Sequence, residues 1–415
     1  MPTSASHQLT DSKGMIRRRF GKTNIMMPIF STGGMRYQDG WTDKPLSDVP
    51  SEGQTNLNNT IIRSLELGIN HIETARGYGP SERQLGVILP QLPREELIVQ
   101  TKLAPTDDPA EFLQHFDESL ERLNLSHVEL LSIHGINDDQ TLQQSVRPGG
   151  CLDAIRTLQA KGLVKHVGFS THGPLDIILK AINHNDQHGG FDYVNLHWYF
   201  IFQRNWPAIQ AATQRDMGVF IISPNDKGGQ LYNAPPSFTN LTGPLHPMAF
   251  NNLFCLSRPE VHTLSCGASK PTDYDIHVDS IKLLDKSNDL IPSIIERLYD
   301  ALETNTACRN PEYHTQFLPD LDQTFGLNLE VILWLRNLTL GWNLTDYAKM
   351  RFNLLGNAGH WFPGGKPQEI LDSITPEQLT AALPNHPDAS VIYDMVNEAI
   401  DLLAGEEVKR LSESD

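Results

Sequence analysis

The chain has 415 residues, of which 39% are hydrophobic and 20% are charged. This composition supports a buried core and excludes a disordered chain, and the length accommodates one large α/β barrel with an additional module. The 33 Lys and Arg residues against 50 Asp and Glu residues give a net charge of −17. An acidic surface repels phosphate backbones, which argues against nucleic acid as a partner. No apolar run approaches the roughly 18 residues of a membrane span.

The N-terminus and the cysteines indicate a reducing compartment. Residues 1–14 are polar and carry no apolar core of a signal peptide. We read them as a flexible tail of a cytoplasmic protein, with a short organelle presequence as the alternative. The four cysteines are Cys151, Cys255, Cys266 and Cys308. None lies in a C-x-x-C pair, which argues against a zinc ribbon, a redox motif or an iron–sulfur run, so we expect buried thiols.

Short apolar, β-branched runs alternate with amphipathic segments of helical length from about residue 27 to residue 285. The expected strands are Met27–Thr32, Ile69–Thr74, Leu97–Leu103, Val128–His134, Val164–Ser170, Tyr193–Trp198, Val219–Pro224 and His262–Gly267. The expected helices include Asn58–Leu67, Pro109–Leu123, Cys151–Lys161, Pro174–Ile182, Trp206–Asp216 and Pro271–Leu284. Eight strand–helix units in series predict an α/β fold with a parallel sheet closed into a (β/α)8 TIM barrel. An open doubly wound sheet is the alternative, but the first strand is followed by Gly33-Gly34 and not by G-x-G-x-x-G.

Different patterns flank the barrel. Residues 15–28 alternate around a Gly-Lys-Thr-Asn turn and predict a hairpin that closes the bottom of the barrel. Past residue 286 the pattern is all-helical, with helices expected at Ile291–Leu302, Leu327–Leu338 and Ala389–Leu403. We therefore expect an N-terminal tail, a barrel, an appended helical module and a C-terminal tail, at residues 1–14, 15–285, 286–405 and 406–415. Asn225–Pro259 is rich in Gly, Pro and Asn and is expected to be a lid or an inert insertion.

Polar residues gather at the expected C-terminal ends of the strands, where barrel enzymes have their active sites. They are Gly33, Gly34, Glu73, Tyr78, Lys102, His134, Ser170, Thr171, Asn195, His197, Ser223, Gly267, Ser269 and Lys270.

Glu73, Lys102 and Tyr78 form the combination with the clearest chemistry. Buried charges are tolerated when they are paired, and Glu73 can pair with Lys102. A lysine beside a tyrosine favours the phenolate and lowers the pKa of the phenol from roughly 10, which makes Tyr78 a competent general acid for a carbonyl oxygen. His134 can orient that oxygen as a neutral donor. The set predicts carbonyl reduction, with the hydride supplied by a cofactor because no side chain carries one.

The remaining strand-end residues suit a nicotinamide dinucleotide. Ser170, Thr171 and Asn195 can bind a carboxamide, and Ser223 with the Gly-rich stretch after it can approach a pyrophosphate. Gly267 and Ser269 precede the last barrel helix, whose N-terminus favours a phosphate. Lys270 suits a 2′-phosphate, so we expect NADPH in preference to NADH.

In this order the residues resemble the aldo-keto reductase family. The family pattern is a strand ending Asp-x-Ala-x-x-x-Tyr-Gly-x-x-Glu, then a strand-end lysine and a strand-end histidine. The chain has "ETARGYGPSE", "VQTKL" and "LLSIHG" at these places. The resemblance covers about residues 15–285 and implies that Tyr78, Lys102 and His134 are catalytic. It also implies that "VGFST", "VNLHW", "IISP" and "CGASK" bind the cofactor.

The chain departs from the family pattern at four positions. Glu73 stands where an aspartate is usual, and Thr171 where an asparagine is usual. Ile222 replaces an aromatic residue that often stacks on the nicotinamide, and His277 replaces an asparagine on the last helix. These departures bear on cofactor affinity and preference more than on reaction type.

The C-terminal helices resemble the tail of a bacterial branch of the family that carries a ferredoxin-like segment. That segment would bring four closely spaced cysteines, and only Cys308 is present in this region. We therefore expect no iron–sulfur cluster.

Two other functions remain open. A metal-dependent hydrolase would use His71, Glu73, His134 and His197 as metal ligands. This alternative explains neither Tyr78 nor Lys102, and we expect no metal. The other alternative is a non-catalytic barrel that binds NADPH and acts as a sensor or scaffold. The favoured reading is an NADP-dependent oxidoreductase that acts on a small-molecule aldehyde or ketone, or on the alcohol in reverse. The sequence leaves the oligomeric state open.

Overall fold

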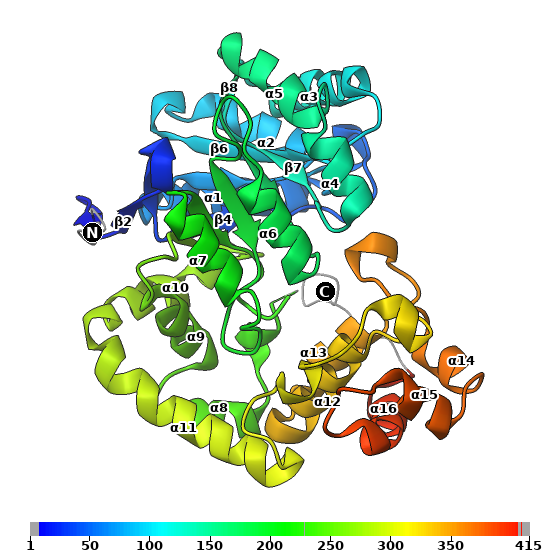
Figure 1. Cartoon of the computed structure of the whole chain (residues 1–415). Helices are drawn as coiled ribbons and strands as arrows, with labels where there is room; N and C mark the ends of the chain where they lie inside the picture. Colours follow the sequence, from blue (N-terminus) through cyan, green and yellow to red (C-terminus); the bar gives the residue numbers. More distant parts are fainter. Residues whose placement is uncertain (1–7, 228, 406–407, 409–415) are drawn as a thin grey trace. The chain divides into compact units, whose positions relative to one another are not determined.

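The computed structural model describes residues 8–227, 229–405 and 408. The chain divides into two compact units, Met1–Gly228 with Asn251–Asp285 and Gly229–Phe250 with Lys286–Asp415. The first unit contains a closed barrel, and the described part of the second is helical (Figure 1). Residues 1–7 of the expected N-terminal tail and all but residue 408 of the expected C-terminal tail lie outside the described residues. Within the expected N-terminal tail, however, strand β1 (Gln8–Thr10) is formed.

Eight parallel strands close the barrel in the order β10-β11-β4-β5-β6-β7-β8-β9. They are β4 (Phe30–Gly33), β5 (His71–Glu73), β6 (Ile98–Leu103), β7 (Val128–His134), β8 (Val164–Ser170), β9 (Tyr193–Leu196), β10 (Gly218–Ile221) and β11 (Thr263–Ser265). The predicted TIM barrel is confirmed, and β7 and β8 begin and end where the sequence places them. The first expected strand was wrong in its extent. The run Met27–Thr32 covers the end of β3 (Met26–Pro28) and most of β4, because the two strands are separated by one residue.

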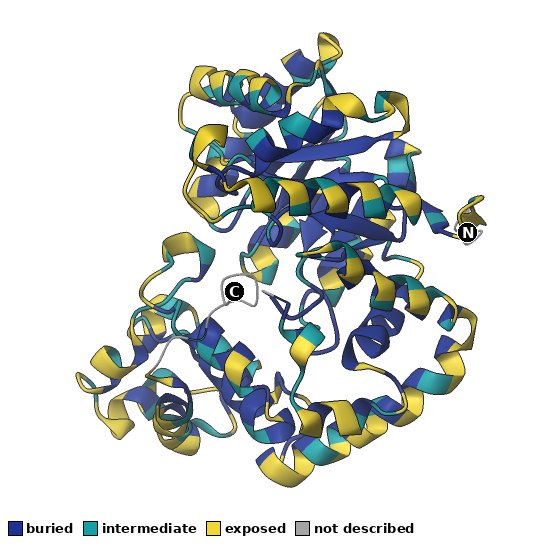
Figure 2. Cartoon of the chain, turned by 180° about the vertical axis from the view of Figure 1, so that it is seen from behind, coloured by how far each residue is buried: buried dark blue, intermediate teal, exposed yellow. Residues whose placement is uncertain are grey.

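The helices of the barrel unit follow the strands in turn. They are α1 (Ser51–Glu66), α2 (Ser81–Ile88), α3 (Pro109–Leu123), α4 (Asp139–Val146), α5 (Cys151–Ala160), α6 (Leu175–Asn183), α7 (Trp206–Gln214) and α10 (Tyr274–Ile281). Helix α3 shows why they form where they do. The Asp108 side chain caps its first turn, Pro109 opens it, and Asn124 ends it in a left-handed conformation. Figure 2 shows the strands buried and the helices exposed on their outer faces.

The N-terminal hairpin closes the bottom of the barrel, as the sequence predicts. Strand β2 (Ile16–Arg19) pairs antiparallel with β3 and with β1. Phe20 follows β2 and is fully buried, with its ring centroid 5.5 Å from that of Tyr193 at the start of β9. A Cβ added to Gly218, at the start of β10, would lie 2.6 Å from the Phe20 ring. The hairpin therefore packs against the N-terminal ends of the strands, away from the mouth.

The second unit is built around one helix. Its helices are α8 (Pro236–Thr242), the start of α9 (Pro247–Leu256), α11 (Ser287–Thr306), α12 (Leu329–Trp342), α13 (Thr345–Phe352), α14 (Pro367–Leu371), α15 (Pro376–Ala382) and α16 (Ala389–Leu403). Helix α12 is apolar and buried on nearly all sides, and it contacts α11, α13 and α16. The stretch Asn225–Pro259, expected to be a lid or an inert insertion, contains helices α8 and α9, which both begin with proline and carry apolar faces.

A hydrogen-bonded belt crosses the interior of the barrel. Each bond is 2.6–3.1 Å long, and the belt runs through six strands. Its members, in order, are Thr263, Ser31, His71, Gln100, Ser132 and Tyr193. Buried polar groups cost free energy unless they are bonded, so the belt fixes the register of these strands directly beneath the mouth.

Among the described residues, we find no helix with the length and apolar character needed to cross a membrane.

Candidate active site

The residues two positions beyond the belt form the next interior layer. Side chains two positions apart on a strand point to the same side. Glu73 therefore follows His71, Lys102 follows Gln100, and His134 follows Ser132 on neighbouring strands. The belt places these three side chains together at the C-terminal mouth, as the sequence predicts for a barrel enzyme.

Lys102 is the centre of this layer. Its side chain is 1% exposed, and its amine forms an ion pair with Glu73, whose side chain is 4% exposed. Lys102 Nζ also donates hydrogen bonds to the Thr74 carbonyl at 2.9 Å and to the Tyr78 hydroxyl at 3.1 Å. Burial lowers the pKa of Lys102 well below its ordinary value, while the Glu73 carboxylate favours the charged amine. The Glu73 side chain is one methylene longer than that of the aspartate in the family pattern described above. In this structure its carboxylate reaches the Lys102 amine.

Tyr78 sits in a tight turn over this ion pair. Lys102 Nζ lies 4.6 Å from the centroid of its ring, and the His134 ring meets it edge-on with centroids 5.6 Å apart. The Tyr78 amide donates to the Ala75 carbonyl, and the Tyr78 carbonyl accepts from the Ser81 amide, both at 3.0 Å. The phenol is therefore held between a buried cation and an imidazole by a turn whose backbone is fixed on both sides.

Gly33 and Gly34 make room for this cluster. A Cβ on Gly33 would lie 2.2 Å from the Ser265 hydroxyl oxygen and 3.5 Å from Glu73 Oε2. A Cβ on Gly34 would lie 2.7 Å from the Glu73 carbonyl oxygen. The two glycines thus permit the end of β4 to pass close to Glu73. The sequence alone does not distinguish this packing role from a role in cofactor binding.

Asn195 offers a site for a carboxamide. In register, His134 pairs with Ser170, and Ser170 pairs with Asn195, so the three lie at one level on β7, β8 and β9. The Asn195 side chain is fully buried, and neither its amide nitrogen nor its amide oxygen has a hydrogen-bond partner among the described residues. A buried unpaired amide costs about 1–3 kcal/mol, so the position fits a ligand with a donor and an acceptor, as nicotinamide has.

The Thr171 hydroxyl is hydrogen-bonded to backbone groups of two loops. It donates to the Ile136 carbonyl at 2.8 Å and accepts from the Gly173 amide at 3.0 Å. It therefore ties together the loops that follow β7 and β8. The expected part of Thr171 in holding a carboxamide stays a prediction.

The loop after β11 is organised by a cation and a carboxylate. Arg36 donates to the Gly267 carbonyl at 2.6 Å and to the Ser269 hydroxyl at 3.3 Å. Asp273 accepts from the Ser269 amide and hydroxyl, both at 2.9 Å. Lys270 is exposed beside them. The sequence points to Gly267, Ser269 and Lys270 but not to Arg36, although an arginine so close behind Gly33-Gly34 was a usable signal.

The loop after β10 joins the same region. Ser223 has a left-handed backbone, with φ of 56°. The Asn225 side chain donates to the Cys266 carbonyl at 3.1 Å, which ties this loop to the end of β11. The Gly-rich stretch expected to approach a pyrophosphate includes residue 228, which lies outside the described residues.

Two histidines of the metal alternative, His71 and His197, have partners elsewhere. Both ring nitrogens of His71 are hydrogen-bonded within the belt, to Ser31 and Gln100, and burial lowers the pKa of His71 to about 3. His197 Nε2 lies 2.9 Å from His172 Nδ1. Within the described part of the chain, no group of three or more His, Cys, Asp or Glu side chains is arranged to hold a metal ion.

Comparison with known proteins assigns the barrel. The profile of the Aldo/keto reductase family matches residues 31–226. This part of the chain belongs to the aldo/keto reductase family. The match contains Tyr78, Lys102 and His134 and confirms the family resemblance. The likeness of the C-terminal helices to a ferredoxin-bearing branch stays a prediction.

The chain is similar to proteins that carry oxidoreductase names. It is 34% identical over 136 residues to L-galactose dehydrogenase of Arabidopsis thaliana, covering 30% of this chain and 40% of that protein. It is 30% identical over 161 residues to D-arabinose 1-dehydrogenase of Saccharomyces cerevisiae, covering 35% of this chain and 43% of that protein. The chain thus spans about two fifths of the length of these curated relatives. The holo form of an aldo-keto reductase from Bacillus halodurans shares the fold, with a TM-score of 0.54 over 67% of this chain and 97% of that chain at 16% identity.

The buried pair predicts a specific pattern of stability. Glu73→Ala and Lys102→Met should each lower the free energy of unfolding by about 3–5 kcal/mol, because each leaves the other charge buried and unpaired. The double variant should lose less than the sum of the two. Lys282→Met, which breaks an exposed ion pair with Asp279, should change stability by less than about 0.5 kcal/mol. Urea unfolding of all four variants measures the coupling, and strictly additive losses would contradict the pair.

Proposed function

We propose that this chain reduces an aldehyde or ketone to an alcohol with NADPH, or catalyses the reverse oxidation. The observation that carries the proposal is the Lys102 amine, buried, paired with Glu73 and 3.1 Å from the Tyr78 hydroxyl. Membership of the aldo/keto reductase family supports an oxidoreductase. Two relatives named as dehydrogenases support the oxidative direction of carbonyl–alcohol exchange.

The proton step belongs to Tyr78. A nicotinamide cofactor, when bound, supplies a hydride to the carbonyl carbon or accepts one from the alcohol. As the carbon gains the hydride, the Tyr78 hydroxyl donates its proton to the carbonyl oxygen, so that C=O becomes CH–OH and the phenol becomes a phenolate. The Lys102 amine stabilises that phenolate at hydrogen-bond distance. In reverse, the phenolate takes the proton from the alcohol.

His134 positions the substrate. Its ring stands edge-on to the Tyr78 ring at the same mouth of the barrel. A neutral imidazole there donates a hydrogen bond to the carbonyl oxygen and holds it within reach of the phenol. The carbonyl oxygen thereby receives two donors, one of which gives up its proton.

The cofactor would be held along β8 to β11 and beside Gly33 and Gly34. The Asn195 amide and the Ser170 hydroxyl would take the carboxamide, and Ser223 would lie along the pyrophosphate. Gly267 and Ser269 would take the adenosine end, where the cations Arg36 and Lys270 outnumber Asp273. An excess of positive charge favours a 2′-phosphate, which supports NADPH over NADH.

Other parts of the proposal rest on composition. The partner is a small carbonyl compound, and the net charge of −17 argues against nucleic acid. The cytoplasm is the proposed location. A non-catalytic NADPH sensor is the competing function, and wild-type protein that bound NADPH tightly without reducing any carbonyl would favour it.

Tyr78→Phe tests the reaction. It should lower kcat by about 10²–10⁴-fold, the usual contribution of a general acid, and leave the Kd for NADPH within about twofold. Tyr313→Phe, which alters an exposed tyrosine, is the matched control and should retain wild-type turnover. Steady-state reduction of a panel of aldehydes and ketones gives kcat, and fluorescence titration gives Kd. Wild-type turnover by Tyr78→Phe would overturn the proposed mechanism.

Lys270→Ala tests the cofactor preference. Removing one charged contact to a 2′-phosphate should raise the Kd for NADPH by about tenfold and leave the Kd for NADH unchanged. Lys282→Ala, at another exposed lysine, should change neither value. Equal weakening of both cofactors by Lys270→Ala would show that Lys270 does not distinguish them.

A further inference from the structure

The loop between β4 and α1 brings a tryptophan to Tyr78. The indole ring of Trp41 meets the Tyr78 phenol edge-on, with centroids 6.1 Å apart. Trp41 is nevertheless 40% exposed, which is unusual for so large an apolar side chain. Tyr78 itself is buried. An indole that touches the proton donor and keeps part of its surface exposed forms a wall beside the reacting group.

The inner part of this loop is fixed against the turn that carries Tyr78. A Cβ on Gly79 would lie 2.3 Å from the Gly40 carbonyl oxygen, so the two backbones approach as closely as glycine allows. The Asp39 amide donates to the Gln84 side chain on α2 at 3.0 Å. These contacts set the base from which Trp41 projects.

The outer part of the loop is held by ion pairs. Arg83 on α2 donates two hydrogen bonds to the Asp43 carboxylate, at 2.9 and 3.3 Å. Arg122, on α3, pairs with the same carboxylate at 2.8 Å. The hydrogen bonds from Arg83, with the further charge of Arg122, lower the pKa of Asp43. Asp43 therefore joins the loop to two separate helices.

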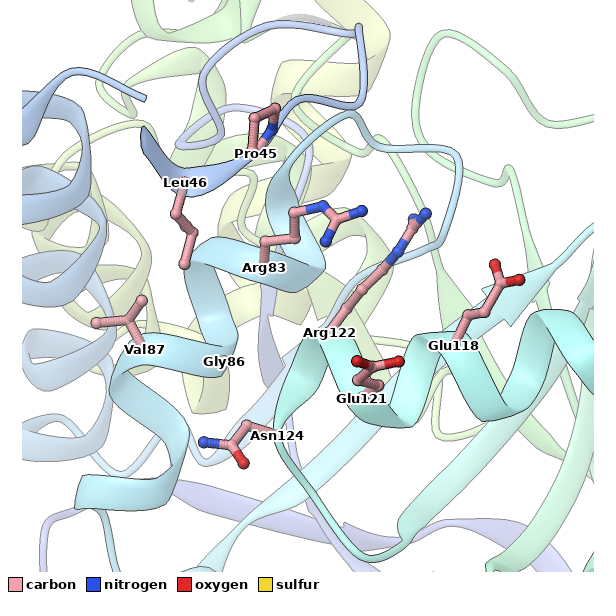
Figure 3. A pocket seen from close by; sticks show the side chains of 9 residues that line it. All are labelled: Pro45, Leu46, Arg83, Gly86, Val87, Glu118, Glu121, Arg122 and Asn124. Carbon is pink, nitrogen blue, oxygen red and sulfur yellow. The ribbon is translucent and has the colours of Figure 1, made fainter. Parts of the chain in front are cut away.

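A pocket lies behind this attachment. Its volume is about 470 Å³, and it is lined by Pro45 and Leu46 of the loop together with residues of α2 and α3. Figure 3 shows Arg83 and Arg122 reaching from the two helices toward the same side of the pocket. The loop thus spans a hollow here instead of packing flush on the helices, and its outer end depends on the Asp43 contacts.

We propose that Asp43 is a positioning residue that holds Trp41 against Tyr78, and that Trp41 determines substrate specificity. The indole face favours carbonyl compounds with a flat or apolar group next to the carbonyl, because such a group is removed from water against it. Asp43 acts only through the loop. The proposal rests on the proposed reductase function for its substrates, but not for the position of the loop.

The kinetic test compares benzaldehyde with acetaldehyde. Trp41→Ala should raise the KM for benzaldehyde by about tenfold, the usual effect of lost apolar contacts in a substrate pocket, and leave that for acetaldehyde within about twofold. Asp43→Asn should shift the benzaldehyde KM in the same direction by about threefold with little change in kcat, and Asp43→Glu, which keeps the charge, should recover part of the loss. Asp216→Asn is the matched control, since it breaks a two-contact pair with Arg19 at the bottom of the barrel.

A second measurement does not depend on turnover. The difference in fluorescence between wild type and Trp41→Phe isolates the emission of Trp41, and in the Asp43→Asn background this difference should move to longer wavelength as the indole leaves Tyr78. Asp216→Asn should not move it. Thermal unfolding should be the same for wild type and both aspartate variants.

Two results would overturn the proposal. One is an Asp43→Asn protein whose Trp41 emission and benzaldehyde KM match those of wild type. The other is a Trp41→Ala protein that is impaired equally on both aldehydes. If the wild-type chain reduced neither aldehyde, the proposed reductase function would fail on these substrates, and the fluorescence comparison would still decide whether Asp43 positions Trp41.

Discussion

A lysine amine buried inside a barrel constrains everything around it. The Lys102 amine is shielded from water. A buried amine is tolerated only when an opposite charge and hydrogen-bond acceptors replace the water. Glu73 supplies the charge, and the Thr74 carbonyl and the Tyr78 hydroxyl supply acceptors. The same arrangement that makes the lysine tolerable also puts a cation on the phenol. In the proposed mechanism, the contacts that stabilise the buried lysine are therefore also the contacts that serve the chemistry.

Precision at this site comes from the strands beneath it. The belt from Thr263 to Tyr193 joins six strands by short hydrogen bonds, and the layer of Glu73, Lys102 and His134 lies two residues further along three of them. A one-residue slip would turn the layer outward, so the belt excludes such slips. The proposed substrate wall, in contrast, comes from a loop attached through Asp43. In the proposed mechanism, rigid strands carry the reaction and a loop varies the substrate, as is general for this architecture.

Sequence reasoning reached the parts of the molecule that depend on short-range pattern. The alternation of strands and helices was sufficient to predict the barrel. The polar residues at the strand ends were sufficient to place Glu73, Lys102 and His134 together at its mouth. It did not reach Trp41, Arg36 or Asp273, because their roles come from contacts between segments far apart in the chain. Asp43 pairs with Arg83 and Arg122, which lie 40 and 79 positions further along the chain on two different helices. No local sequence pattern encodes such a contact. Helices α8 and α9 were missed because Gly, Pro and Asn suggested a loop, whereas proline also opens helices.

In the proposed mechanism, the buried Lys102–Glu73 pair makes Tyr78 acidic, and this effect on Tyr78 can be measured. It is tested most directly by following phenolate absorption as pH rises, in wild type minus Tyr78→Phe, and then in the same difference made in a Lys102→Met background. We expect the Tyr78 phenolate to form well below pH ~10, the unperturbed value for tyrosine, and to form at or above that pH once Lys102 is replaced. If Tyr78 ionised at pH ~10 or higher in the wild-type protein, or at the same pH in both backgrounds, the buried pair would not set its acidity.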